Sequence, residues 1–300
     1  MKIIYDPKYR FPEFDHVFPI SKYWRLYDRI QSDYEVQVDV RTPFFPTKED
    51  LLFTHSESYL DDLLNCRFTE QTEASEFPLT PELLSGLRLM VGGSMKTFLL
   101  AMEFGAAFHI GGGFHHAFSD RAEGFCYFND IAIGVERLKR EGVQNILILD
   151  LDVHQGNGTA KLFQRDPGVF TFSMHQENNY PVKQKGDLDV GLRDALGDEE
   201  YLGILETNLQ KICSMFSPEF VIYVAGVDVH KEDRLGGLGL TKHGVFERDR
   251  AVFEFCFRNG FPVGVVLAGG YSQKVEDTID LHYGTFRALA GYFEGANSLT

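Results

Sequence analysis

The chain has 300 residues, of which 44% are hydrophobic and 24% charged, a composition that is typical of globular proteins and argues against global disorder. Its 29 lysines and arginines stand against 44 aspartates and glutamates, and the net charge of −15 argues against a protein that binds nucleic acid directly. The same acidity suits solubility and would attract basic ligands or protein tails.

At the N-terminus, residues 1–16 lack the long apolar run of a signal peptide, and no uninterrupted apolar stretch approaches membrane-spanning length. The cysteines lie far apart without a CxxC pair, so neither a disulfide framework nor a cysteine zinc site is expected; they are Cys66, Cys126, Cys213 and Cys256. We therefore expect a soluble cytoplasmic protein with reduced cysteines, and a nuclear location stays open if the source is eukaryotic.

The first hundred residues are less regular than the rest. Residues 48–64 and 80–103 are predicted to be helices. Between them, residues 67–78 (RFTEQTEASEFP) predict an exposed surface loop, with the lining of a site entrance as the alternative.

From residue 106 onward, predicted strands and helices alternate. Apolar runs that end in polar or glycine-rich turns predict strands within 106–113, 145–152, 220–228 and 262–271. Capped periodic segments predict helices at 129–142, 198–216 and 241–260, with a last helix at 278–293. Continuously apolar strands separated by helices indicate an α/β protein with a parallel sheet covered on both faces. We find no repeat or linker, so residues 1–300 are expected to form a single domain.

Ligands of an open parallel sheet bind beyond the carboxyl ends of its strands, so the polar residues after each apolar run belong together. Each of the four predicted strands is followed by residue types that serve in hydrolysis: His115 and His116; Asp150, Asp152 and His154; Asp228; and Tyr271. The sequence therefore predicts one site at this edge of the sheet.

Three of these residues suggest a metal site. Asp152 and His154, with Asp228, would make a mixed oxygen and nitrogen ligand set that suits zinc and leaves a position open for water or substrate. Ferrous iron would fit the same ligands. The alternative is structural, because carboxylates that follow strands often cap the next helix.

The paired histidines follow Gly111–Gly113, and a glycine-rich turn can aim both at one target, which neither a helix nor a strand would do. With the metal held elsewhere, His115 and His116 would be available for proton transfer. Tyr271, on a glycine turn, could donate its hydroxyl to an oxyanion or could simply be an exposed turn residue. His109, inside an apolar run, is expected to be a satisfied buried side chain.

Four motifs carry a resemblance to a known family: GGGFHHAFSDRAEGFCYFND, ILDLDVHQGNG, GVDVHKEDRLGGLGL and AGGY. In their order and spacing the chain resembles the zinc-dependent histone deacetylase family, and the HQGNG and DRLGGL versions resemble its class IV branch. The resemblance implies a single-domain arginase/deacetylase fold, with a central eight-stranded parallel β-sheet flanked by helices on both faces.

The resemblance also implies roles for individual residues. Asp152, His154 and Asp228 match the zinc ligands, His115 and His116 the catalytic histidines, Tyr271 the tyrosine that polarises the substrate carbonyl, and Asp150 the carboxylate behind the first histidine. A structural K⁺ ion is implied at Asp150, Asp152, His154, Ser173 and Met174. The tunnel that admits the substrate is implied at Gly124, Phe125, Tyr180, Leu235, Gly236 and Gly237.

One departure concerns the partner of the second histidine. Many deacetylases carry a carboxylate there, whereas this chain has Asn157, and Gln155 replaces another histidine. Because asparagine orients an imidazole without stabilising its cation, we expect His116 to be less basic than it would be beside an aspartate.

The implied substrate is an acyl-lysine protein or peptide with an acetyl or a long fatty acyl group. Gly236 and Gly237 could leave room for a long acyl chain, or could simply form a turn. Two alternatives stay open: an amidohydrolase of acetylated polyamines, and a catalytically idle module that binds acyl-lysine. A two-manganese ureohydrolase is disfavoured because Gly156 stands where a second metal would need a carboxylate.

Overall fold

The computed structural model describes residues 1–11, 14–33 and 36–297. Within these residues, eight strands form one sheet in the order β2-β1-β3-β8-β7-β4-β5-β6, and every neighbouring pair is parallel. The strands are β1 (Lys2–Ile4), β2 (Asp39–Arg41), β3 (Ala106–His109), β4 (Ile146–Asp150), β5 (Val169–Gln176), β6 (Leu188–Leu192), β7 (Phe220–Val224) and β8 (Val263–Val266). The predicted α/β fold class is confirmed.

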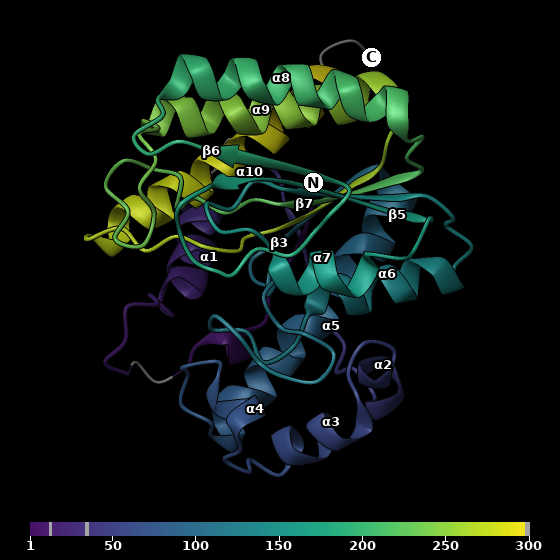
Figure 1. The fold of residues 1–300 in the computed structure, drawn as a ribbon. Helices are drawn as coiled ribbons and strands as arrows, with labels where there is room; N and C mark the ends of the chain where they lie inside the picture. The colour runs from purple at the N-terminus through teal and green to yellow at the C-terminus, as the bar shows by residue number, and fades with distance from the viewer. Residues whose placement is uncertain (12–13, 34–35, 298–300) are drawn as a thin grey trace.

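Helices cover both faces of this sheet. They are η1 (Pro7–Tyr9), α1 (Lys22–Ser32), α2 (Lys48–Leu52), α3 (Glu57–Leu64), α4 (Glu70–Glu73), α5 (Pro81–Phe104), α6 (Asp130–Arg140), α7 (Asn157–Phe163), α8 (Asp198–Met215), α9 (Lys242–Asn259) and α10 (Val275–Asn297). Figure 1 shows α8 and α9 on one side of the sheet and α5, α6 and α7 on the other. The short helices α2, α3 and α4 lie beyond α5, away from the sheet.

The four strands predicted from apolar runs are β3, β8, β7 and β4, which are neighbours in the middle of the sheet. Every residue of these four strands is buried. A strand covered by helices on both faces needs apolar side chains on both, which is why these runs are continuous. Since the four strands are adjacent and parallel, their carboxyl ends meet in one place.

The long helix α5 is a core helix. Among the described residues it is the one helix long and apolar enough to span a membrane by length and composition, but 72% of its apolar window is buried inside the protein. It packs against β3, β8 and α6. Its apolar residues are therefore accounted for by the protein core.

Two expectations for the first hundred residues need correction. Residues 48–64 form two helices, because Ser56 takes an extended backbone and accepts a hydrogen bond from the backbone of Tyr59, which starts α3 anew. Residues 67–78 are largely exposed but are not a simple loop, and the alternative of a site entrance applies to them. They include α4, with Thr72 and Phe77 buried, and Glu76 reaches the candidate site described below.

Arg248, a fully buried residue of α9, forms hydrogen bonds with both of the segments that follow β4 and β7. Nη1 of Arg248 donates to the carbonyl oxygens of Gly226 at 2.6 Å and Leu151 at 3.2 Å, and Nη2 lies 2.7 Å from Oδ1 of Asp249. Neither side chain of this ion pair is exposed. The segments that carry Asp152 and Asp228 are thus fixed to each other through one guanidinium.

Replacing Arg248 by methionine should lower the free energy of unfolding by roughly 3–5 kcal/mol, because the charge of Asp249 is then left buried without its partner. Denaturant unfolding of the variant and the parent measures the loss. Arg250→Met is the matched control, since Arg250 makes an exposed pair with Glu247, and its loss should be below about 1 kcal/mol. Equal losses in the two variants would contradict the assignment.

Candidate active site

The possible metal ligands come together at the ends of β4 and β7. One ligand atom from each of Asp152, His154 and Asp228 lies within 4.8 Å of the others, and all three residues are buried. Nδ1 of His154 lies 3.1 Å from Oδ1 of Asp152 and 3.2 Å from Oδ2 of Asp228. The structure therefore brings these three predicted residues to one point.

The environment of this triad fits a divalent cation. Oδ1 of Asp228 accepts a 2.8 Å hydrogen bond from the backbone of Val153, and Oδ2 of Asp152 accepts one of the same length from Gly269. In contrast, the buried Oδ2 of Asp228 accepts no hydrogen bond from any described residue. A Cβ on Gly269 would lie 2.0 Å from this oxygen, so glycine keeps the space beside it open. Of the described residues, only the His154 ring lies within ion-pair distance of this buried carboxylate oxygen, an environment that is unfavourable unless a cation binds there, and two carboxylates with an imidazole suit zinc.

Charges within the triad are strongly coupled. Burial and the neighbouring Asp152 raise the pKa of Asp228 to about 7. Burial alone would lower the pKa of His154, but the two aspartates outweigh it and raise the pKa to about 10. A proton therefore competes with a metal ion for this cluster.

The two histidines follow β3 and are supported by different partners. Nδ1 of His115 lies 2.8 Å from Oδ2 of Asp150, and Nδ1 of His116 lies 2.9 Å from Oδ1 of Asn157. The ring centroids of the two histidines are 4.0 Å apart. The preceding turn needs Gly113, whose φ is 84° and where a Cβ would lie 2.5 Å from the backbone nitrogen of Ala268.

The surroundings of the two histidines give His115 a higher pKa than His116. For His115, burial lowers the pKa, but Asp150 and Asp152 outweigh it and raise the pKa to about 9. For His116, burial and the neighbouring His115 hold the pKa well below its usual value. At neutral pH the first ring is therefore a cation, and the second is neutral and able to accept a proton.

Tyr271 is buried at the turn after β8, and its backbone nitrogen donates a 2.7 Å hydrogen bond to Oδ2 of Asp233. Burial and the nearby Asp152 and Asp228 raise the pKa of its phenol well above the usual value. The hydroxyl therefore keeps its proton and is available as a hydrogen-bond donor. The exposed-turn alternative does not apply to this side chain.

A cavity of about 210 Å³ leads to these groups. Its lining residues are Glu76, His116, Gly124, Phe125, His154, Asn179, Tyr180, Leu235 and Tyr271. Gly124, Phe125, Tyr180 and Leu235 thus lie where the resemblance implied a tunnel.

Gly236 and Gly237 do not line this cavity. A Cβ on Gly236 would lie 2.0 Å from the carbonyl oxygen of Asp228, and one on Gly237 would lie 2.5 Å from Nε2 of Gln176. Both glycines therefore permit close packing of the chain, and the structure offers no room for an acyl group at either.

Of the residues implied for a K⁺ ion, Asp150 ends β4, Asp152 and His154 follow it, and Ser173 and Met174 lie on the adjacent strand β5. Asp150 pairs in register with Ser173, whose hydroxyl lies 2.9 Å from Nδ1 of His175, and Met174 follows in the same strand. Occupancy by an ion stays a proposal. His109 is buried as expected, with Tyr9 and Ser94 each 3.0 Å from one of its ring nitrogens.

Lys22 and Asp233 have structural roles at the site that were not predicted from the sequence. Lys22 is fully buried, donates a 2.6 Å hydrogen bond to the carbonyl oxygen of Ala268, and lies 5.9 Å from the ring centroid of Tyr271. Burial lowers its pKa to about 8. Nothing in SKYWRL distinguishes this lysine from an ordinary surface residue. Oδ1 of Asp233 accepts hydrogen bonds from the backbone nitrogens of Leu235 and Gly236. An aspartate that bonds the backbone two residues later is typical of a turn, so this role could have been predicted from the sequence.

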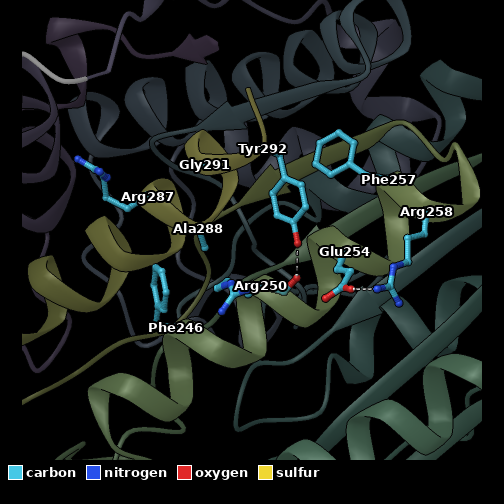
Figure 2. A pocket seen from close by; sticks show the side chains of 9 residues that line it. All are labelled: Phe246, Arg250, Glu254, Phe257, Arg258, Arg287, Ala288, Gly291 and Tyr292. Carbon is cyan, nitrogen blue, oxygen red and sulfur yellow. Dashed lines mark hydrogen bonds and ion pairs between the residues drawn. The ribbon is translucent and has the colours of Figure 1, made fainter. Parts of the chain in front are cut away.

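A second hollow lies between α9 and α10 and contains none of the predicted site residues (Figure 2). Its arginines are matched by carboxylates: Arg250 pairs with Glu247, Arg258 with Glu254, and Arg287 with Asp33. The groups able to perform hydrolysis are gathered at the strand ends instead.

Comparisons with known proteins agree with this geometry. Residues 16–284 match the histone deacetylase domain. The chain is 34% identical to histone deacetylase 2 of Arabidopsis thaliana over 272 residues, which cover 86% of this chain and 70% of that protein. It is 40% identical to an uncharacterized protein of Picosynechococcus sp. over 286 residues, which cover 93% of this chain and 95% of that protein. Among solved structures, an HDAC homologue from Aquifex aeolicus superposes with a TM-score of 0.83 at 28% identity, covering 97% of this chain and 84% of that one.

Proposed function

The chain belongs to the histone deacetylase family, whose members are hydrolases of acetylated amides, and on that premise we propose that it is a zinc-dependent lysine deacylase. The observation that carries the proposal is the cavity itself. It is lined at once by a possible metal ligand (His154), a neutral histidine (His116) and a buried phenol (Tyr271). Those are the groups that hydrolysis of an unactivated amide requires.

The size of the cavity favours a slender substrate with a short acyl group. Its volume of about 210 Å³ is below the ~300–1,000 Å³ of pockets that hold drug-sized ligands. An acetylated lysine side chain is narrow and mostly apolar, which suits walls formed by Phe125, Tyr180 and Leu235. The net charge of −15 suits a basic protein or peptide.

Each residue of the site has a defined task in this proposal. Asp152, His154 and Asp228 would hold the zinc ion, which would supply Lewis-acid chemistry for the amide. The Tyr271 hydroxyl donates a hydrogen bond to the carbonyl oxygen as negative charge develops there. His116, bonded to Asn157 through Nδ1, takes a proton on Nε2 from the attacking water and returns it to the lysine nitrogen.

The direct test is turnover, by metal-reconstituted protein, of one lysine peptide carrying an acetyl, octanoyl or myristoyl group, with N-acetylspermidine alongside. We expect the acetyl peptide to be the best substrate. Turnover of the polyamine alone would move the function to small-molecule metabolism. No turnover of any of the four by protein with bound zinc would overturn the proposal in favour of an acyl-lysine binding module.

The partner of His116 should set the acid limb of the pH profile. In Asn157→Asp, a carboxylate stabilises the protonated ring and raises the pKa of His116, which burial and His115 otherwise hold low. Because the base must be unprotonated, the acid limb of kcat/KM should move to higher pH, by about one unit or more. Profiles from pH 5 to 9 for both proteins measure the shift, and coincident acid limbs would contradict the expectation.

A further inference from the structure

The asparagine that supports His116 is itself bound to a carboxylate. Nδ2 of Asn157 donates a 2.6 Å hydrogen bond to Oε1 of Glu123, while Oδ1 of Asn157 lies 2.9 Å from Nδ1 of His116. Asn157 is 1% exposed, and the side chain of Glu123 is 22% exposed, next to Gly124 of the cavity wall. The three side chains form a hydrogen-bonded chain that ends at a carboxylate.

A side-chain amide can face an imidazole in two ways, and each dictates where the ring carries its proton. With Oδ1 of Asn157 toward the ring, His116 must carry its proton on Nδ1 to donate it. With Nδ2 toward the ring, Nδ1 of His116 must accept, and the proton sits on Nε2. Only the first arrangement leaves a lone pair on Nε2, where proton transfer takes place.

Glu123 decides between these arrangements. A carboxylate accepts hydrogen bonds and donates none, so Nδ2 of Asn157 faces Glu123 and Oδ1 faces His116. The Tyr180 hydroxyl and the Arg121 guanidinium, each 3.5 Å from a Glu123 oxygen, are further donors to it. Hydrogen bonds to a charged acceptor are the stronger kind, which makes the opposite orientation of the amide unfavourable.

We propose that Glu123 is a positioning residue that selects the Nδ1–H tautomer of His116 by fixing the amide of Asn157. An aspartate at position 157 would need no such residue, because both of its oxygens accept. The consequence for catalysis rests on the proposed function, in which His116 is the general base.

A graded series at position 123 tests the proposal. Glutamate only accepts, glutamine in Glu123→Gln accepts or donates, and lysine in Glu123→Lys only donates and so favours the reversed amide. We expect kcat for the acetyl-lysine peptide to fall a few-fold in Glu123→Gln and about a hundredfold or more in Glu123→Lys, since a wrong imidazole tautomer costs up to ~10⁴ in a serine-protease triad. The KM should change by less than about threefold in both, because Glu123 acts on the base and not on substrate binding.

Two further variants separate this role from a general effect of charge. Asp120→Lys makes the same charge change on the same segment, where the Asp120 side chain is 66% exposed and paired with Arg121, and it should leave kcat unchanged. In an Asn157→Asp background the ring has an acceptor whatever stands at position 123, so Glu123→Lys should lose its effect. If Glu123→Lys lowers kcat equally in the parent and in the Asn157→Asp background, the proposal is overturned.

A readout that needs no turnover is the tautomer itself. In protein labelled with ¹⁵N-histidine, two-bond nitrogen–proton correlations report which ring nitrogen of His116 carries the proton, with His116→Gln identifying the signal. The proposal expects Nδ1–H in the parent and Nε2–H in Glu123→Lys. Nδ1–H in both proteins would overturn it. If the tautomer moves as expected but no acyl-lysine peptide is hydrolysed by the parent, the proposed function fails and the role of Glu123 stands.

Discussion

Tyr271→Phe should lower kcat for an acetyl-lysine peptide by about 10²–10³-fold, the usual cost of removing one donor that stabilises a developing oxyanion. The phenol is buried, and its raised pKa keeps it protonated, so the hydroxyl is a donor at all working pH values. Because that hydrogen bond strengthens as the carbonyl oxygen becomes negative, the loss should fall on kcat, with KM within about threefold of the parent.

The measurement is steady-state kinetics at matched zinc content. Tyr292→Phe is the control, because the Tyr292 hydroxyl lies in the hollow between α9 and α10, where it donates to the carbonyl oxygen of Arg250 (Figure 2). Removing that hydroxyl should leave kcat unchanged. An unaltered kcat in Tyr271→Phe would exclude the phenol from the reaction, and a rise in KM alone would make it a binding group.

The central strands of the sheet could be predicted because their burial is visible in short stretches of sequence. The strands β3, β4, β7 and β8 are buried on both faces, and the sequence shows this as unbroken apolar runs. By contrast, β5 alternates apolar residues such as Phe172 with polar ones such as Ser173, a pattern typical of a half-exposed strand, although every residue in it is buried. The strands β1 and β2, at one end of the sheet, have only three residues each, too few to show any period.

The same reasoning explains which site residues were found. Polar groups directly after apolar runs converge because parallel strands end at one edge, so His116, Asp152 and Asp228 could be grouped without coordinates. Lys22 and Glu123 act through partners that lie far away in sequence, at Ala268 and Asn157, and no local pattern pairs them. Such residues become visible only when the hydrogen bonds of buried groups are followed one by one.

The second large effect is expected for Asp228→Asn, which removes the charge of the triad oxygen that has no donor among the described residues. A neutral amide binds zinc much more weakly than a carboxylate does, so bound zinc per chain should fall more than tenfold and kcat/KM about 10³-fold or more. Metal analysis after dialysis and peptide kinetics measure the two losses. Asp280→Asn is the control, because that carboxylate pairs with Arg29 and Lys242 at the surface.

Although Asp228→Asn should bind zinc poorly, it should be more stable than the parent when both proteins are free of metal. Burial and Asp152 raise the pKa of Asp228 in the folded chain to about 7, above the 3.8 expected when it is exposed. Metal-free parent protein therefore loses stability as pH rises between these values, and the neutral asparagine avoids that loss. At pH 8, metal-free Asp228→Asn should be the more stable protein by on the order of 1 kcal/mol, with the difference shrinking toward pH 4. A carboxylate that served only to support the fold would give the reverse, so thermal unfolding of both metal-free proteins at the two pH values distinguishes a ligand from a structural residue.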